Sequence, residues 1–443
     1  MLGLGFGDCG KGRCVDALAR RWCAHTVVRF CGGAQAGHHV VAPHPQGGEI
    51  HHTFSQFGAG TLVPGTRTLL LDPMVVHPTA LLVEAEVLGK AGVTGALSRM
   101  VIDRRCRVTT PFHQAAGRLR EMARAGEAHG TCGVGVGETV RHGLEYPGQV
   151  IRFGDLAIRG KSESTHCLER LDATRRTLLN ECVPSLSDID SPAARAELDC
   201  LSDPTLAERW LGQASALARQ CPPASGDLIH DLLHQPGCVL FEGAQGVLLD
   251  EWRGFHPHTS WGSTTCDAVE RALEPYEIAS PIEHYGVLRT YQTRHGAGPF
   301  PTEDPALDPL LPEPHNGDGG WQGRFRRGHP DAVLLDYAIL ACGNLTGLCV
   351  GHLDVFGRDL ELKWCDGYER AGGSILRHLP HGQRGDLEHQ MRLTRLLSEI
   401  QPRYAECPIR SDAEFLERLS GVTALPVVMM SYGPAHTCQR SLI

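Results

Sequence analysis

Hydrophobic residues along the chain form short runs that alternate with amphipathic stretches. Strand-like apolar runs occur at residues 1–4, 26–30, 68–72, 100–103, 238–242 and 286–291 and within 345–355, and helix-like periodicity occurs at residues 15–22, 78–88, 111–124 and 331–342. Strands that alternate with helices predict an α/β fold with a largely parallel central sheet. Residues 156–233 are chiefly helical in pattern, which predicts a helical subdomain packed on that sheet.

Irregular segments separate these elements. Residues 33–39 and 293–303 are rich in Gly, Pro and polar residues and are predicted to be loops. Residues 304–323 form a long irregular insertion, the best position for a mobile lid. The first strand has only residues 1–4 before its glycines, so it is either clipped or unusually short. Without a repeat or a low-complexity linker, the 443 residues predict one elaborated domain.

A glycine-dense turn follows the first strand. Residues 5–11 fit G-x-x-x-x-G-K, in which backbone N–H groups surround phosphate oxygens and Lys11 adds a positive charge. Position 12 is Gly, where a Ser or Thr normally binds magnesium, so the nearest hard oxygen donor within the loop is the carboxylate of Asp8. The alternative is that these glycines serve only the geometry of a strand-to-helix turn.

Composition narrows the class of protein. A hydrophobic content of 42% and a charged content of 21% are ordinary for a globular enzyme, and the net charge of -9 argues against nucleic acid or an anionic membrane as the main partner. We expect a cytoplasmic protein, since no run of about 18 apolar residues and no basic-then-apolar leader occurs. The 17 cysteines contain no C-x-x-C pair and are expected to be reduced and mostly buried. Neighbouring histidines at 38–39 and 51–52 point in different directions, so a histidine metal cluster is not expected.

Six sequence blocks carry a resemblance to a known family. They are residues 8–12, 32–38, 241–246, 293–303, 353–355 and 433–434. In this order, over the full length, the chain resembles the adenylosuccinate synthetase family. The resemblance implies a ligase in which a nucleoside triphosphate, expected to be GTP, phosphorylates the 6-oxygen of IMP, and L-aspartate then displaces the phosphate to give adenylosuccinate. It further implies Mg²⁺ as cofactor, small-molecule substrates and a homodimer.

The resemblance also implies roles for individual residues. The implied catalytic residues are Asp8 as base, His38 as acid and Lys11, and the implied metal ligands are Asp8 and the carbonyl of Gly37. The implied triphosphate-binding residues are Gly7, Gly10, Lys11, Gly12, His39, Arg326, His352, Asp354, Ser431 and Gly433. The implied IMP-binding residues are Asp8, Gln35, Cys132, Gln245, Ser260 (with Thr259 as an alternative in register) and Arg324. The implied amino-acid-binding residues are Gly320, Trp321, Gln322 and Arg324, and Arg141 is a guess for the arginine that the family takes from a neighbouring subunit.

Several positions depart from the family pattern. Cys9, Gln35, His39, Cys132 and His352 replace the Glu, Asn, Thr, Thr and Lys that the family usually has, and residues 319–322 replace a threonine-rich amino-acid loop. The residues implied in triphosphate binding and proton transfer thus match the family, whereas residues of the nucleotide pocket and of the amino-acid pocket differ from it. This pattern leaves open a paralogous ligase that acts on another oxo-purine nucleotide or another amine. A nucleotide-binding regulator without turnover is disfavoured, because a pure binder needs neither a base nor an acid.

Overall fold

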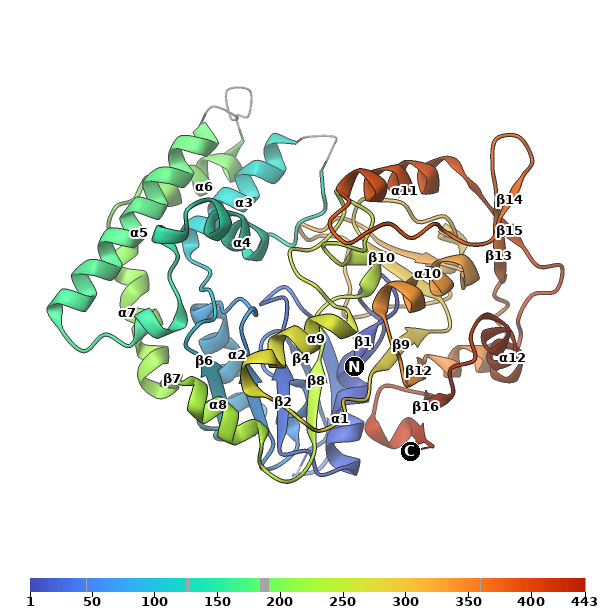
Figure 1. Cartoon of the computed structure of the whole chain (residues 1–443), viewed down its shortest axis with the longest axis horizontal. Helices are drawn as coiled ribbons and strands as arrows, with labels where there is room; N and C mark the ends of the chain where they lie inside the picture. Colours follow the sequence, from blue (N-terminus) through green and yellow to red (C-terminus); the bar gives the residue numbers. More distant parts are fainter. Residues whose placement is uncertain (45, 125–127, 184–190, 359, 443) are drawn as a thin grey trace.

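A parallel β-sheet forms the centre of the structure, a computed structural model that describes all residues except 45, 125–127, 184–190, 359 and 443 (Figure 1). One half of the sheet has the strand order β1-β9-β12-β16-β17, and the other has the order β7-β6-β5-β2-β8. The pairs between these strands are parallel except for β16 with β17. The bounds are β1 Leu2–Gly3, β2 Thr26–Arg29, β5 Arg67–Leu70, β6 Met100–Asp103, β7 Pro223–Ala224, β8 Val239–Glu242, β9 Tyr285–Arg289, β12 Gly347–Gly351, β16 Val427–Ser431 and β17 Gln439–Ser441.

The two halves meet where β1 lies beside β8. The amino group of Met1 donates to the carbonyl of Phe241 at 2.8 Å, and the amide of Gly243 donates to the carbonyl of Met1 at 3.0 Å. A parallel bridge between Gly3 and Gly246 continues this contact. The glycine-dense turn therefore starts in the middle of the combined sheet, and the predicted α/β class with a largely parallel sheet is confirmed.

Helices cover the sheet and form a separate layer at one end (Figure 1). The helices around the sheet are α1 Lys11–Arg21, α2 Pro78–Lys90, α8 Gly226–Leu233, α9 Cys266–Leu273, α10 Ala332–Cys342, α11 Leu387–Glu399 and α12 Asp412–Val422. The separate layer contains α3 Pro111–Ala123, α4 Val136–Glu145, α5 Lys161–Cys182, α6 Pro192–Ser202 and α7 Leu206–Gln220, in which α3 contacts α4, α5 and α6. Within residues 156–233 the described part contains α5 to α8 and the short strand β7, while residues 184–190 lie outside it.

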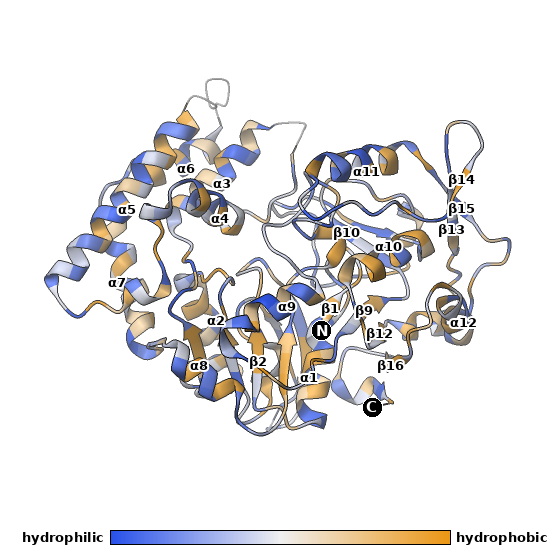
Figure 2. Cartoon of the chain, in the orientation of Figure 1, coloured by the Kyte–Doolittle hydropathy of each residue, from blue (hydrophilic) through white to orange (hydrophobic). Residues whose placement is uncertain are grey.

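Local sequence explains where several helices begin. Thr110 accepts a hydrogen bond from the amide of His113 ahead of Pro111, the first residue of α3. Asp331 accepts from the amides of Val333 and Leu334 at the start of α10. The central strands around β2 are strongly hydrophobic and α11 is mainly hydrophilic (Figure 2), as expected for a sheet that is covered on both faces. No helix in the described ranges has the length and apolarity that a bilayer span requires.

Two predicted loops contain strands. Residues 292–295 form β10 (Gln292–His295), which pairs antiparallel with β11 (Phe325–Gly328), so the expectation of irregular structure from residue 293 onward was wrong for its first residues. Likewise β3 (His38–Pro43) begins inside the predicted loop and pairs with β4 (Glu49–Phe54). In both cases a partner strand supplies the backbone hydrogen bonds that local composition does not reveal. A three-stranded sheet of β13 (Cys365–Glu369), β14 (Ile375–Leu376) and β15 (Gln401–Tyr404) completes the strands.

The cysteines agree with the prediction for reduced, mostly buried thiols. All 17 are free, and eleven of them are buried. Residues 304–323 contain one short 3-10 turn at Pro305–Leu307 and are otherwise irregular, as predicted.

Candidate functional site

The turn between β1 and α1 has the backbone geometry of a phosphate-binding loop. Gly7 and Gly10 have positive φ values of 118° and 88°, which residues with a side chain rarely adopt. Gly10 is also the N-cap of α1, so the first amides of this helix face the turn. The buried ammonium of Lys11 lies 3.4 Å from the carbonyl of Gly7 and 3.4 Å from the sulfur of Cys9. This cluster of donors is suited to an anion.

Gly12 lies directly against His38. A Cβ atom at position 12 would lie 2.9 Å from the Cβ of His38 and 3.1 Å from its backbone carbon. Real Cβ atoms do not approach this closely, so only glycine lets α1 pack against the start of β3. The missing Ser or Thr at this position is thus explained by packing against a candidate catalytic residue.

The Gly12→Ala variant is expected to displace His38, to lower kcat by about 10-fold or more and to cost about 1–3 kcal/mol of folding free energy. Steady-state kinetics and thermal unfolding measure the two effects. Gly89→Ala in α2 is the matched control, because a Cβ at Gly89 meets nothing within 4 Å. Activity of Gly12→Ala equal to that of the wild type would show that His38 tolerates the displacement.

His38 forms a buried pair with Glu242 at the end of β8. The Nδ1 atom of His38 lies 2.6 Å from Oε1 of Glu242, and its Nε2 atom lies 3.1 Å from the carbonyl oxygen of Ala244. Burial lowers the pKa of His38, and the Glu242 carboxylate opposes this shift. Burial also opposes ionisation of Glu242, but His38 and Arg29 bring its net pKa below the ordinary value. The pair orients the imidazole and supports its protonated form.

Glu242 was not assigned a role from the sequence. It lies within the block of residues 241–246, and its position at the carboxyl end of a buried parallel strand is where such sheets place functional groups. Its second oxygen accepts from the amide of Ala59 at 2.9 Å, which fixes the carboxylate. A charged residue at the end of an otherwise apolar strand is the signal that would have identified it.

Asp8 lies in the same turn as Lys11 and remains accessible. Its side chain is 26% exposed, and one carboxylate oxygen lies 4.0 Å from Nε2 of His295. Asp8 and His38 both line a cavity of about 990 Å³. The carboxylate can therefore reach a solute that also contacts His38.

Most residues expected to bind ligands line this cavity. They are Gly7, Asp8, Gly10, Lys11, Gly12, Gln35, Gly37, His38, His39, Cys132, Gln245, Thr259, Ser260, Gln322, His352, Asp354 and Gly433. The side-chain oxygens of Gln35 and Gln245 are buried and lack a hydrogen-bond partner among the described residues. Since buried polar atoms normally have a hydrogen-bond partner, these two amide oxygens are available to accept a hydrogen bond from a ligand.

The sequence of the whole chain matches a known family. The sequence model of the family described as adenylosuccinate synthetase matches residues 1–438. The chain belongs to the adenylosuccinate synthetase family. It is accordingly a ligase that forms a carbon–nitrogen bond and acts on small-molecule substrates, and the prediction of this family from the sequence is confirmed.

Relatives of similar length support the family assignment. The chain is 32% identical to the adenylosuccinate synthetase of Alkalilimnicola ehrlichii, with 98% of this chain and 95% of the relative covered. It is 30% identical to that of Colwellia psychrerythraea, with 98% and 96% covered.

Two solved structures share the fold. The fully ligated adenylosuccinate synthetase of Plasmodium falciparum has a TM-score of 0.75 at 20% identity, with 99% of this chain and 98% of that chain covered. The succinoaminodeoxyadenylate synthetase of cyanophage S-2L, bound to dGMP and dATP, has a TM-score of 0.60 at 16% identity, with 100% and 94% covered.

Not every residue suggested by the family resemblance is part of the cavity wall that the described residues form. Outside it are Gly320, Trp321, Arg324, Arg326 and Ser431. Arg324 and Arg326 both pair with Glu303, at 2.7 and 2.8 Å. Trp321 packs against Gly133, and the guanidinium of Arg118 lies 5.5 Å from the centre of its ring. This contact links the 304–323 segment to α3 in the helical layer.

Ser431 and Arg141 also have intramolecular partners. The hydroxyl of Ser431 donates to the carbonyl of Gly433 at 3.0 Å. Arg141 on α4 lines the cavity and is held by Glu138 at 2.6 Å and Glu181 at 2.7 Å.

Proposed function

We propose that this protein is an adenylosuccinate synthetase that couples IMP to L-aspartate at the expense of GTP. The observation that carries the proposal is the arrangement of Asp8, Lys11 and the His38–Glu242 pair around one cavity. A purine 6-oxo group needs a base at N1 and stabilisation of negative charge at the phosphoryl group, and these side chains offer both functions.

In the proposed reaction, Asp8 accepts the N1 proton of IMP, so that O6 attacks the γ-phosphorus and the nucleoside diphosphate leaves. Lys11 and the amides at the start of α1 stabilise the charge on the transferred phosphoryl group. His38 donates from Nε2 to the phosphorylated oxygen, which requires this nitrogen to exchange the Ala244 carbonyl for the substrate. The aspartate amino group then attacks C6 and releases phosphate.

We propose Mg²⁺ as the cofactor, held by the carboxylate of Asp8 and the carbonyl of Gly37. Both groups line the cavity and offer the hard oxygen atoms that Mg²⁺ prefers. When bound, the ion would neutralise charge on the phosphates. Gly12 supplies no hydroxyl ligand, which makes the Asp8 carboxylate the more important donor of the loop.

Asp354 is the proposed recognition site for the base of the triphosphate. A carboxylate accepts the two N–H groups on one edge of guanine, whereas adenine lacks this edge. Asp354 pairs with Arg358 at 2.9 Å, and the nearby His352 contacts Arg13 at 2.6 Å. A guanine base would therefore compete with the Arg358 guanidinium for the Asp354 carboxylate, or both would bind this carboxylate together.

We also propose a homodimer as the functional assembly. The segment 304–323 is proposed as a mobile loop that contributes to the aspartate site. Glu303 would be the residue that releases Arg324 and Arg326 when anionic substrates arrive, because it now pairs with both. Guanidinium groups bind carboxylates and phosphates in the same forked geometry.

Phosphate release with Mg²⁺ tests the proposal. The assay uses GTP or ATP, with IMP and L-aspartate each present or omitted. We expect release that requires both substrates, accompanied by the absorbance change of adenylosuccinate, and a higher kcat/KM with GTP. Release that requires a different amine or a different purine nucleotide would contradict the proposed substrates.

A further inference from the structure

The β3–β4 hairpin places two histidines on one face. In its antiparallel register His39 lies opposite Thr53 and Val41 lies opposite His51, so these four side chains share a face. Their neighbours His38 and His52 are buried on the other face. Adjacent histidines do point in different directions, but each pair contributes one member to the same face. The hairpin register therefore brings His39 and His51 together, which the sequence did not reveal.

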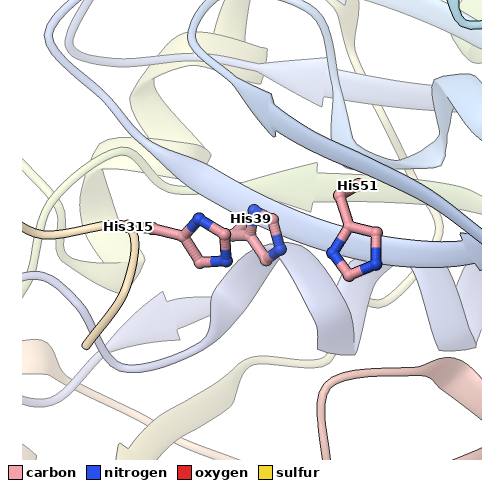
Figure 3. Close-up of side chains that lie close together, drawn as sticks. All are labelled: His39, His51 and His315. Atoms are coloured by element: carbon pink, nitrogen blue, oxygen red, sulfur yellow. The ribbon is translucent and has the colours of Figure 1, made fainter. Parts of the chain in front are cut away.

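A third imidazole comes from the irregular segment 304–323. His315 stacks on His39 with ring centres 3.6 Å apart, and His51 lies on the other side of His39 (Figure 3). One nitrogen from each of the three rings lies within 4.8 Å of the others. All three residues line the cavity that contains the phosphate-binding turn.

The hydrogen bonds of His39 leave one nitrogen for a ligand. Its Nδ1 atom lies 3.0 Å from the hydroxyl of Thr53, and its Nε2 atom is buried without a partner among the described residues. In metal-binding histidines, a hydrogen bond at the ring nitrogen that does not bind the metal commonly fixes the orientation of the ring. In His51, Nε2 lies 3.4 Å from a carboxylate oxygen of Glu49, which leaves Nδ1.

Residues on both sides of His315 fix the position of its backbone. Glu313 accepts a hydrogen bond from Tyr291 at 2.7 Å and pairs with the buried Arg289. Asn316 donates to Glu313 at 3.3 Å and accepts at its own oxygen from His295 at 3.4 Å. The ring of His315 is exposed, so it can turn while its backbone stays in place.

We propose that His39, His51 and His315 form a binding site for a transition-metal ion such as Zn²⁺ or Co²⁺, which fastens the 304–323 segment to the β3–β4 hairpin. Zn²⁺ binds imidazole nitrogen at about 2.0–2.1 Å, so two nitrogens of a tetrahedral site lie about 3.3 Å apart. The three nitrogens now lie within 4.8 Å of one another, and rotation of the exposed rings of His315 and His51 would bring them to this shorter distance. The site is distinct in chemistry from the Asp8 and Gly37 oxygens, because imidazole favours transition metals over Mg²⁺.

Titration with Co²⁺, in excess Mg²⁺ and after treatment with a chelator, tests the site through visible absorption. We expect one Co²⁺ per chain with an imidazole-type spectrum, and an affinity at least about 100-fold lower in the His51→Gln/His315→Gln double variant. Both residues are exposed, so thermal unfolding of this variant should match the wild type. Hydrogen exchange of residues 304–323 should slow on addition of Co²⁺ in the wild type and not in the variant.

A second histidine pair provides the matched control. His230 on α8 and His234, the C-cap residue of this helix, are also stacked, with ring centres 4.0 Å apart, and neither lines the cavity. The His230→Gln/His234→Gln variant should retain the Co²⁺ signal. Absence of stoichiometric binding, a thiolate-type spectrum, or equal affinity in the His51→Gln/His315→Gln variant would overturn the proposal. Binding without slower exchange in residues 304–323 would overturn the fastening role.

Discussion

The Asp8→Asn variant is expected to lose about 1,000-fold in kcat while its affinity for the triphosphate changes little. Asparagine keeps the size of the side chain and its place in the turn, but it cannot accept the N1 proton. In the proposed site the direct phosphate contacts come from Lys11 and backbone amides, which the substitution leaves unchanged, and the amide oxygen of asparagine still offers Mg²⁺ a ligand. Phosphate release measures turnover, and calorimetry with a non-hydrolysable triphosphate analogue measures binding.

Asp16→Asn is the matched control for this experiment. Asp16 lies on α1 and pairs with Arg20 at 2.9 Å, and burial raises its pKa. Its substitution should leave kcat near the wild-type value, because Asp16 does not line the cavity. Near-normal turnover in Asp8→Asn would show that another group is the base.

The Glu242→Gln variant is expected to lower kcat by about 100-fold and to shift the pH profile. His38 donates a proton only when protonated, so its function is present below its pKa and is lost as the pH rises through it. Burial already lowers the pKa of His38, and Glu242 raises it. Without this carboxylate the pKa falls further, so the alkaline loss of activity begins at a lower pH. Profiles of kcat/KM against pH measure the shift.

Glu84→Gln separates this effect from a loss of structure. Glu84 is also buried, accepts from the amides of Ser55 and Gln56 at 2.8 and 2.9 Å, and lies 3.7 Å from His52. Its substitution should destabilise the protein and leave the pH profile unshifted. A Glu242→Gln profile that coincides with the wild type would rule out the positioning role.

Local sequence signals were sufficient for the family and for the glycine-dense turn between β1 and α1. Glycines with positive φ and a lysine at the start of a helix are recognisable because the required backbone geometry restricts the residue types. Most strands of the central sheet were predicted because a parallel sheet covered on both faces requires continuous apolar runs, whereas β16 was not predicted. The beginning of β3 and most of β10 were missed, because their stability depends on partner strands rather than on their own composition.

Contacts between distant segments were decided by tertiary structure alone. Glu242 meets His38 from a strand 204 residues away, and His315 reaches His39 from an irregular insertion. The sequence by itself determined the fold class and the glycine-dense turn that carries Asp8 and Lys11, since these follow from local backbone and side-chain properties. Only the tertiary structure decided which carboxylate orients His38 and which histidines share a face, because pairing register and loop position depend on the whole fold.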